Sequence, residues 1–154
     1  MQGHAWYYWL AGALEQAGDK IDIVSHHTYG DSRIELNYKL NANTPFGDTP
    51  DRWGRKSPSL REVLEYTKWD GPVWLTETGW DSDKAGTSDP PWQVERLGQF
   101  LEDWFGDRPK ERDWLDKVFI YEMSGSGKGL LHHNGTTKKA YHTYAAFIAA
   151  NPVP

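Results

Sequence analysis

Apolar residues follow two alternating spacings along the chain. Longer segments carry them three and four positions apart, as in amphipathic helices, and short apolar runs bounded by turn residues are typical of buried strands. Helices are predicted at residues 5–17, from 57 onward, at 90–105 and at 139–150, and strands at 21–27, 73–78 and 118–123. Helices that alternate with strands in this way predict an α/β fold with a parallel sheet.

The longest polar segment separates the first strand from the second helix. Residues 30–57 are rich in Asn, Pro and Gly and include Tyr38, Phe46 and Trp53. Unstructured loops of this size in compact domains usually have a function. We expect this loop to follow the C-terminal end of its strand and to present aromatic side chains to a ligand.

The strand at residues 73–78 carries the most informative residue of the chain. Its apolar run leads to Glu77, and Gly79 and Trp80 follow. A carboxylate at the C-terminal end of a parallel strand lies where α/β proteins bind ligands and carry out chemistry. Glu77 is therefore the first candidate for a catalytic residue.

Several segments, in the right order, resemble one family. Residues 74–80 (Trp-Leu-Thr-Glu-Thr-Gly-Trp) resemble the seventh strand of retaining glycoside hydrolases built on the (β/α)8 barrel, in which the glutamate of a Thr-Glu-x-Gly-Trp segment is the nucleophile. His27 and Tyr29 match the His-x-Tyr of the sixth strand, residues 118–123 resemble the eighth strand, and residues 129–141 resemble the closing segment of the family. The resemblance covers nearly the whole chain. It implies a partial (β/α)8 (TIM) barrel, with residues 1–154 as a single domain.

The same resemblance implies an O-glycosyl hydrolase that acts on β-linked oligo- or polysaccharides. Glu77 would attack the anomeric carbon to form a glycosyl-enzyme, which water then hydrolyses. Retention requires a second carboxyl about 5–5.5 Å away, and inversion requires one at about 6.5–9.5 Å. Glu122, at the end of the next strand, is the best candidate for that acid, and a structural role or a sugar contact is its alternative.

Four further residues are candidates for substrate binding. The family pattern implies that Tyr29 and His27 lie near the nucleophile, so we expect Tyr29 to hydrogen-bond Glu77 and His27 to contact a sugar hydroxyl. A structural role is the alternative for His27. Trp53 and Trp80 offer flat surfaces on which sugar rings can stack, although aromatic side chains also pack in cores.

Strand alternation predicts how the second strand is oriented. Residues two apart share a face, so Val73, Leu75 and Glu77 are expected to point into the barrel. Trp74 is expected to point outward and to pack under the helices.

The length of the chain limits this interpretation. A full barrel has eight strands in about 250 residues, whereas this chain has 154 residues and three predicted strands. The family's general acid/base belongs to an Asn-Glu pair after the fourth strand, and the chain contains no Asn-Glu dipeptide. The chain is then the C-terminal part of a longer enzyme, or a shortened protein. A non-catalytic carbohydrate-binding protein and an inactive barrel fragment are the alternatives.

An open sheet of three parallel strands also predicts self-association. Such a sheet has two unpaired edges and one uncovered apolar face. Val73, Leu75 and Ile23 are expected to face water in a lone chain, at a cost of about 1.5–3 kcal/mol each. A homo-oligomer would cover them, and it could bring a second carboxylate to Glu77.

Composition narrows the remaining functional classes. The net charge of −5 gives no basic surface for nucleic acid, and no apolar run is long enough to cross a membrane. There is no cysteine, and the histidines, including the adjacent pair His26 and His27, lack the helical spacing of a metal site. We therefore expect no metal and no cofactor. The N-terminus lacks the basic and apolar regions of a signal peptide, and the sequence assigns no cellular location to a chain that we expect to be soluble.

Overall fold

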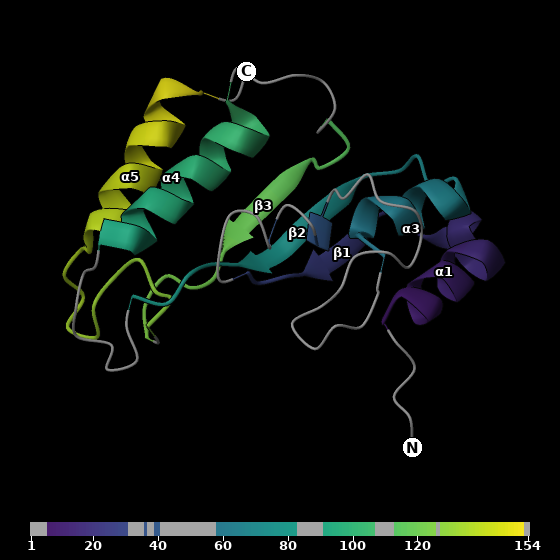
Figure 1. The fold of residues 1–154 in the computed structure, drawn as a ribbon, viewed down its shortest axis with the longest axis horizontal. Helices are drawn as coiled ribbons and strands as arrows, with labels where there is room; N and C mark the ends of the chain where they lie inside the picture. Colours follow the sequence, from purple (N-terminus) through teal and green to yellow (C-terminus); the bar gives the residue numbers. More distant parts are fainter. Residues whose placement is uncertain are drawn as a thin grey trace.

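Strands and helices alternate along the chain, as the periodicity predicts. The computed structural model describes residues 6–30, 36, 39–40, 58–82, 91–106, 113–125 and 127–152. Its elements are α1 (Trp6–Ala17), the short 3-10 helix η1 (Gly18–Lys20), β1 (Val24–His27), α3 (Leu60–Thr67), β2 (Val73–Thr78), α4 (Pro91–Phe105), β3 (Lys117–Ile120) and α5 (Lys139–Ala150) (Figure 1).

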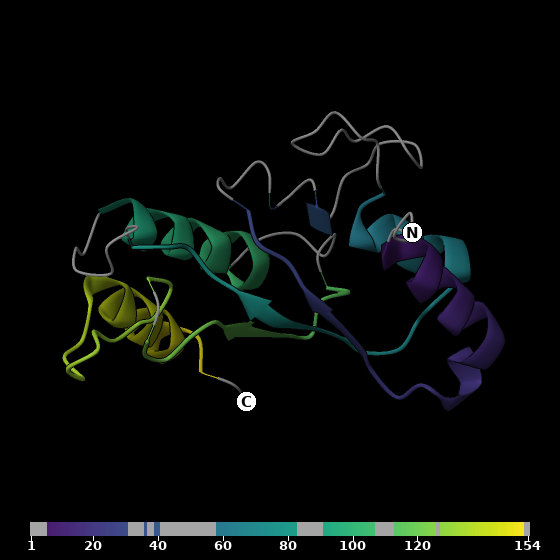
Figure 2. The same cartoon turned by 90° about the horizontal axis from the view of Figure 1, so that it is seen from below.

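The three strands form one parallel sheet in the order β1-β2-β3. Parallel neighbours require a crossover between them, and α3 and α4 lie in these crossovers along the chain. In two perpendicular views, α4 lies beside α5 at one end of the sheet and α1 lies beside α3 at the other (Figures 1 and 2). The structure confirms the predicted fold class, an α/β arrangement in which parallel strands alternate with helices as part of a barrel.

The start of α3 differs from the prediction by two residues. The sequence predicted a helix from residue 57 onward, but the structure places its N-cap at Ser59, whose side chain accepts a hydrogen bond from the Glu62 backbone N–H. The Glu62 carboxylate in turn accepts from the backbone N–H of Ser59 at 2.7 Å. This reciprocal capping box needs a glutamate three residues after the cap, and Ser59 is the serine that has one.

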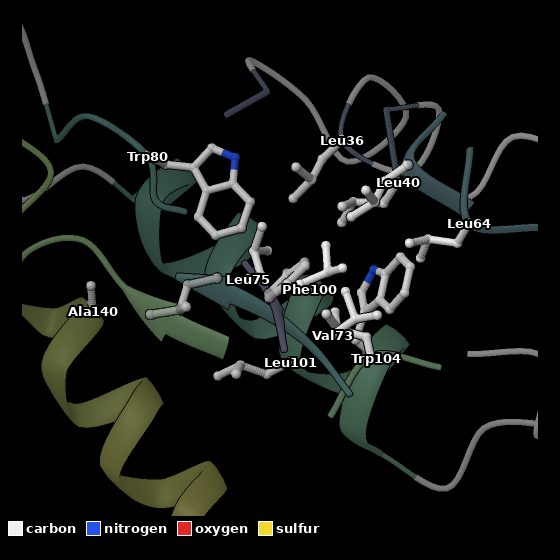
Figure 3. Close-up of a cluster of buried hydrophobic side chains, with 14 of the residues drawn as sticks. Leu36, Leu40, Leu64, Val73, Leu75, Trp80, Phe100, Leu101, Trp104 and Ala140 are labelled. Carbon is white, nitrogen blue, oxygen red and sulfur yellow. The ribbon is translucent and has the colours of Figure 1, made fainter. Parts of the chain in front are cut away.

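One face of the sheet packs against the helices. Val73 and Leu75 of β2 are 1% and 0% exposed, and they lie in a buried apolar cluster with residues of α3 and α4 (Figure 3). Trp74 lies on the opposite face, 6.1 Å from Phe119 between ring centroids. The predicted orientation of Val73, Leu75 and Trp74 was therefore reversed, because alternation groups the residues by face without showing which face the helices cover.

Irregular pairing of β2 with its neighbouring strands places Glu77 on the opposite face of the sheet from Leu75. The register between β2 and β3 shifts between Leu75 and Thr78, and Thr78 is as fully buried as Leu75. Two residues, rather than one, separate these helix-facing positions, which is the geometry of a β-bulge. Glu77 pairs with His27 of β1, where a second shift occurs, and its side chain is 34% exposed. Glu77 thus lies on the open face, which corresponds to the inside of a barrel.

The open face carries the exposed apolar residues of the sheet. The expectation that Val73 and Leu75 face water was wrong, since the helices bury both. Ile23, just before β1, is 37% exposed as expected, and Phe119 of β3 is 47% exposed. Within the described residues no helix is both long and apolar enough to span a membrane.

Most of the long loop predicted to carry ligand-binding aromatics, including Tyr38, Phe46 and Trp53, lies outside the described residues. Its described parts include Leu36 and Leu40, which are buried in the core (Figure 3).

Candidate functional site

Three of the predicted site residues meet at the C-terminal ends of β1 and β2. The Tyr29 hydroxyl donates a hydrogen bond to Oε2 of Glu77 at 2.8 Å. Nδ1 of His27 lies 3.4 Å from the same oxygen, with the imidazole 56% exposed. The backbone also joins the strands here, since Thr28 N donates to the Glu77 carbonyl at 3.1 Å. We name Glu77, Tyr29 and His27 the carboxylate cluster.

Tyr29 remains a proton donor in this environment. Burial raises the pKa of its hydroxyl well above the usual value, and the hydrogen bond and negative charge of Glu77 raise it further. The Tyr121 ring meets the Tyr29 ring edge-on at 6.3 Å. A phenol that stays protonated can hold one carboxylate oxygen in a fixed position.

The two adjacent histidines lie in different surroundings. His26 packs against Trp6 at 4.8 Å between ring centroids, and burial lowers its pKa to about 4 with a smaller effect from His27. Only His27 contacts Glu77. Among the described residues, no group of three or more His, Asp or Glu side chains is arranged to hold a metal ion.

Glu122 lies just beyond β3, after a cis peptide bond from Tyr121. Its carboxylate lies against Gly125, where an added Cβ would come within 3.3 Å of Oε2. Its backbone oxygen accepts from Leu130 N at 2.9 Å. The charge of Glu122 makes the smallest of the contributions that raise the pKa of Tyr29, and the role of Glu122 as an acid stays a prediction.

The structure places Trp80 in the core instead of at the surface. Its side chain is 4% exposed, and it packs against Phe100 of α4 at 5.6 Å between ring centroids (Figure 3). The ring therefore offers no open face to a sugar. Trp53, the other predicted stacking residue, lies outside the described residues.

Two charged residues beside the carboxylate cluster, Lys128 and Asp81, were not predicted from the sequence as part of the site. Lys128 lies with its Nζ 3.2 Å from Oδ2 of Asp81 and 5.4 Å from the centre of the Tyr29 ring. Both residues come from loops that follow strands, and only the tertiary structure brings them together. Their sequence signal was weak, since a glycine-rich loop with one lysine is common.

Glycine at position 79 is required by a close approach between strand ends. A Cβ there would collide with the carbonyl oxygen of Tyr121, and Tyr121 N donates to the Thr78 carbonyl at 2.7 Å. The Gly-Trp part of the Thr-Glu-Thr-Gly-Trp segment is therefore explained by packing: Gly79 lets the ends of β2 and β3 approach, and Trp80 fills the core.

A buried lysine fixes the loops around these strand ends. Lys138 is almost fully buried, and its Nζ donates to Ser82 Oγ at 3.1 Å and to the Gly127 carbonyl at 3.2 Å. Ser82 N also donates to the Gly127 carbonyl, at 2.7 Å. These bonds hold the loop after β2 against the loop after β3, which keeps Asp81 and Lys128 beside the carboxylate cluster.

Comparisons with known proteins give matches at the level of structure. No protein-family model and no curated protein matches the chain. A GH128 endo-β-1,3-glucanase from Amycolatopsis mediterranei, solved as a mutant with laminaripentaose, is 17% identical with a TM-score of 0.52, over 92% of this chain and 52% of that one. A GH2 β-galacturonidase from Eisenbergiella tayi is 17% identical with a TM-score of 0.49, over 84% of this chain and 24% of that one. The β-glucuronidase of Bifidobacterium dentium is 18% identical with a TM-score of 0.49, over 88% of this chain and 21% of that one.

This likeness concerns the fold. The chain spans about half the length of the GH128 enzyme and about a quarter of the GH2 enzyme. Its three parallel strands and their helices have the arrangement of a partial barrel, and its structural neighbours are glycoside hydrolases.

Proposed function

We propose that this chain carries the nucleophile of a glycoside hydrolase that acts on β-linked oligo- or polysaccharides, and that Glu77 is that nucleophile. The observation that supports it is the partly exposed Glu77 carboxylate at the end of a parallel strand, held through Oε2 by Tyr29 at 2.8 Å. The similarity of the fold to that of the GH128 endo-β-1,3-glucanase is consistent with the same class of reaction.

The contacts of Glu77 assign different tasks to its two oxygens. Tyr29 and His27 both approach Oε2, so we assign the attack on the anomeric carbon to Oε1. A new bond forms between Oε1 and that carbon as the glycosidic C–O bond breaks, and the leaving oxygen takes a proton from an acid. Water then releases the sugar from Glu77. Tyr29 keeps the carboxylate from rotating, so that its orientation is set before the substrate arrives.

The acid is the least defined part of the mechanism. Glu122 is the candidate within this chain, because it follows the strand next to β2 and lies near enough to affect Tyr29. The alternative source is a carboxylate outside these residues, from a longer polypeptide or from a second subunit.

A substrate that needs no acid tests the nucleophile separately. In a 2,4-dinitrophenyl 2-deoxy-2-fluoro-β-glucoside, the aglycone leaves as a stable dinitrophenolate without a proton from an acid, and the fluorine on the sugar slows hydrolysis of the glycosyl-enzyme. We expect mass spectrometry of the intact chain to show one added sugar, located on Glu77 by peptide mapping. Glu77→Gln should abolish the adduct, and Glu15→Gln, on the exposed surface of α1, should retain it. An adduct elsewhere, or none, would refute the assignment.

Glu122→Gln then tests the acid. With an aryl β-glucoside of poor leaving ability, kcat should fall by about 10²-fold or more, within the usual contribution of general acid catalysis. With the dinitrophenyl substrate it should change little. If the substitution changed kcat by the same factor with both substrates, Glu122 would have a structural role instead.

A second candidate is non-catalytic carbohydrate binding on the open face of the sheet. The observation that favours it is the pair of half-buried Trp74 and exposed Phe119, with Lys117 Nζ 4.6 Å from the centre of the Trp74 ring. Titration with laminaripentaose, followed by tryptophan fluorescence, should then show binding that Trp74→Ala removes while no glycoside is hydrolysed.

A further inference from the structure

Two buried side chains tie the loop after β2 to the loop after β3. Gln93 of α4 is 2% exposed, and its Nε2 donates to the Trp80 carbonyl at 2.9 Å and to the Lys128 carbonyl at 3.4 Å. Lys138, just before α5, is 1% exposed and also donates to both loops. Neither loop can therefore shift without breaking a hydrogen bond to a buried donor, which is unfavourable.

The two ties flank one ion pair beside the carboxylate cluster. Asp81 lies between Trp80 and Ser82, to which the buried side chains donate. Lys128 Nζ lies 3.2 Å from Oδ2 and 3.4 Å from Oδ1 of Asp81. Ion pairs near the surface are usually weak, in part because two long side chains must be ordered in one geometry. Here the backbone of both partners is already fixed, so less conformational freedom is lost when the pair forms.

Lys128 also lies against the aromatic ring of Tyr29. Its Nζ is 5.4 Å from the ring centre, within the distance of about 6 Å at which a cation over an aromatic face is attracted to it. The Lys128 side chain is only 29% exposed, which strengthens such a contact. Tyr121 approaches the same ring perpendicularly at 6.3 Å. A cation and a second ring therefore restrict how the Tyr29 ring can move.

The orientation of this ring decides where its hydroxyl group points. The hydroxyl donates to Oε2 of Glu77 at 2.8 Å, and its oxygen lies on the long axis of the ring. A tilt of that axis moves the oxygen, and hydrogen bonds weaken as they lengthen and bend. The attraction between Lys128 and the Tyr29 ring opposes a tilt away from Lys128, so it also preserves the bond to Glu77.

We propose that Lys128, held by Asp81, is a positioning residue that keeps the Tyr29 hydroxyl on the Glu77 carboxylate. It acts through Tyr29, by way of the hydrogen bond to Oε2. The effect of Lys128 on hydrolysis rests on the proposed function of Glu77, whereas its effect on the Tyr29 hydrogen bond does not. The two effects are therefore measured separately.

The hydrogen bond is followed by NMR in a chain that carries ¹³C at Cζ of tyrosine, with the Tyr29 signal assigned from Tyr29→Phe. Lys128→Met keeps the length of the side chain and removes its charge, and it should shift this signal. Lys128→Arg, which retains a cation, should keep it near the wild-type position. Lys20→Met, at an exposed lysine in η1, should leave it unchanged.

The same substitution in Glu77→Ala separates positioning from a direct effect of charge. Without the Glu77 carboxylate there is no hydrogen bond to preserve, so any shift that Lys128→Met still causes there is the direct effect of the lost charge. We expect a clearly larger shift when Glu77 is present. Equal shifts in the two backgrounds would overturn the proposal, whatever the kinetics show.

The consequence for Glu77 is measured as the rate of glycosyl-enzyme formation with the dinitrophenyl fluoroglucoside. Lys128→Met should slow this step about 3- to 10-fold, the size expected of one cation–π contact, and Lys128→Arg should recover most of the rate. In Tyr29→Phe, which has no hydroxyl to position, Lys128→Met should cause no further loss, because residues that act through one contact are not additive.

The outcomes distinguish this proposal from the proposed function. An equal loss of rate with and without the Tyr29 hydroxyl would show a general effect on the loops and overturn the positioning role. If the wild-type chain forms no adduct while the Tyr29 signal responds as expected, the function proposed for Glu77 fails and the positioning contact is supported.

Discussion

Tyr29 is the residue on which the geometry of Glu77 depends most directly. Its hydroxyl lies 2.8 Å from Oε2, and hydrogen bonds to charged groups contribute about 1.5–3 kcal/mol. If Glu77 is the nucleophile, Tyr29→Phe should lower kcat by about 10- to 100-fold, with a smaller change in KM. Steady-state kinetics on an aryl β-glucoside measures this, with Tyr8→Phe on α1 as the control. A wild-type kcat in Tyr29→Phe would remove Tyr29 from the mechanism.

His26 predicts a dependence of stability on pH. Its pKa is lowered from 6.5 to about 4 in the folded chain, so between these values the unfolded state binds a proton that the folded state does not. The free energy of unfolding should therefore be unaffected above pH 6.5 and fall as the pH drops toward 4, by about 3 kcal/mol in total.

Urea denaturation at several pH values measures this fall. His26→Phe keeps an aromatic ring beside Trp6 and removes the titration, so its stability should decrease less between pH 6.5 and 4. The exposed His133→Asn should behave like the wild type. An unchanged pH dependence in His26→Phe would show that other groups cause it.

At the scale of elements, the capping box of α3 offers a defined test. The Ser59 hydroxyl accepts a hydrogen bond from Glu62 N at 3.2 Å, and the backbone N–H of Ser59 donates to the Glu62 carboxylate at 2.7 Å. Ser59→Ala should lower the free energy of unfolding by about 0.5–2 kcal/mol. Glu65→Gln, which breaks only the exposed pair with Arg61, should cost less than about 1 kcal/mol. Equal losses in thermal denaturation would argue against the cap.

The bulge in β2 is the element that determines what Glu77 faces. In a regular strand Glu77 would share the helix-covered face of Val73 and Leu75, where an ionised carboxylate is costly to bury. The register shift between Leu75 and Thr78 instead places it beside His27 and Tyr29. Bulges often redirect side chains next to active sites, and here the redirection creates the carboxylate cluster.

At the scale of the whole molecule, we propose that the open face of the sheet mediates association. Phe119 is 47% exposed and lies beside Trp74, and two copies could cover these side chains. Light scattering at micromolar concentration should report a dimer or larger species, and Phe119→Lys should shift it toward the monomer. Ile148→Lys, which changes an equally exposed apolar residue on α5, should not. A monomeric wild-type chain would refute the proposal.

The order of the elements and the carboxylate cluster were accessible from the sequence. Helix and strand periodicities are local, so they predicted every named strand and four of the helices. Glu77 followed from its place at a strand end, and Tyr29 and His27 followed from the resemblance of their segment to the family's His-x-Tyr. The sequence did not predict four features: which face the helices cover, the register shifts, the burial of Trp80 and the position of Lys128. Each of these features depends on which distant segments pack together. Alternation in a strand is the same for either face, so it does not show which face the helices cover, and a register shift arises only from pairing with a neighbouring strand. A tryptophan side chain is equally suited to packing in a core and to stacking on a sugar, so its burial is decided by the tertiary structure.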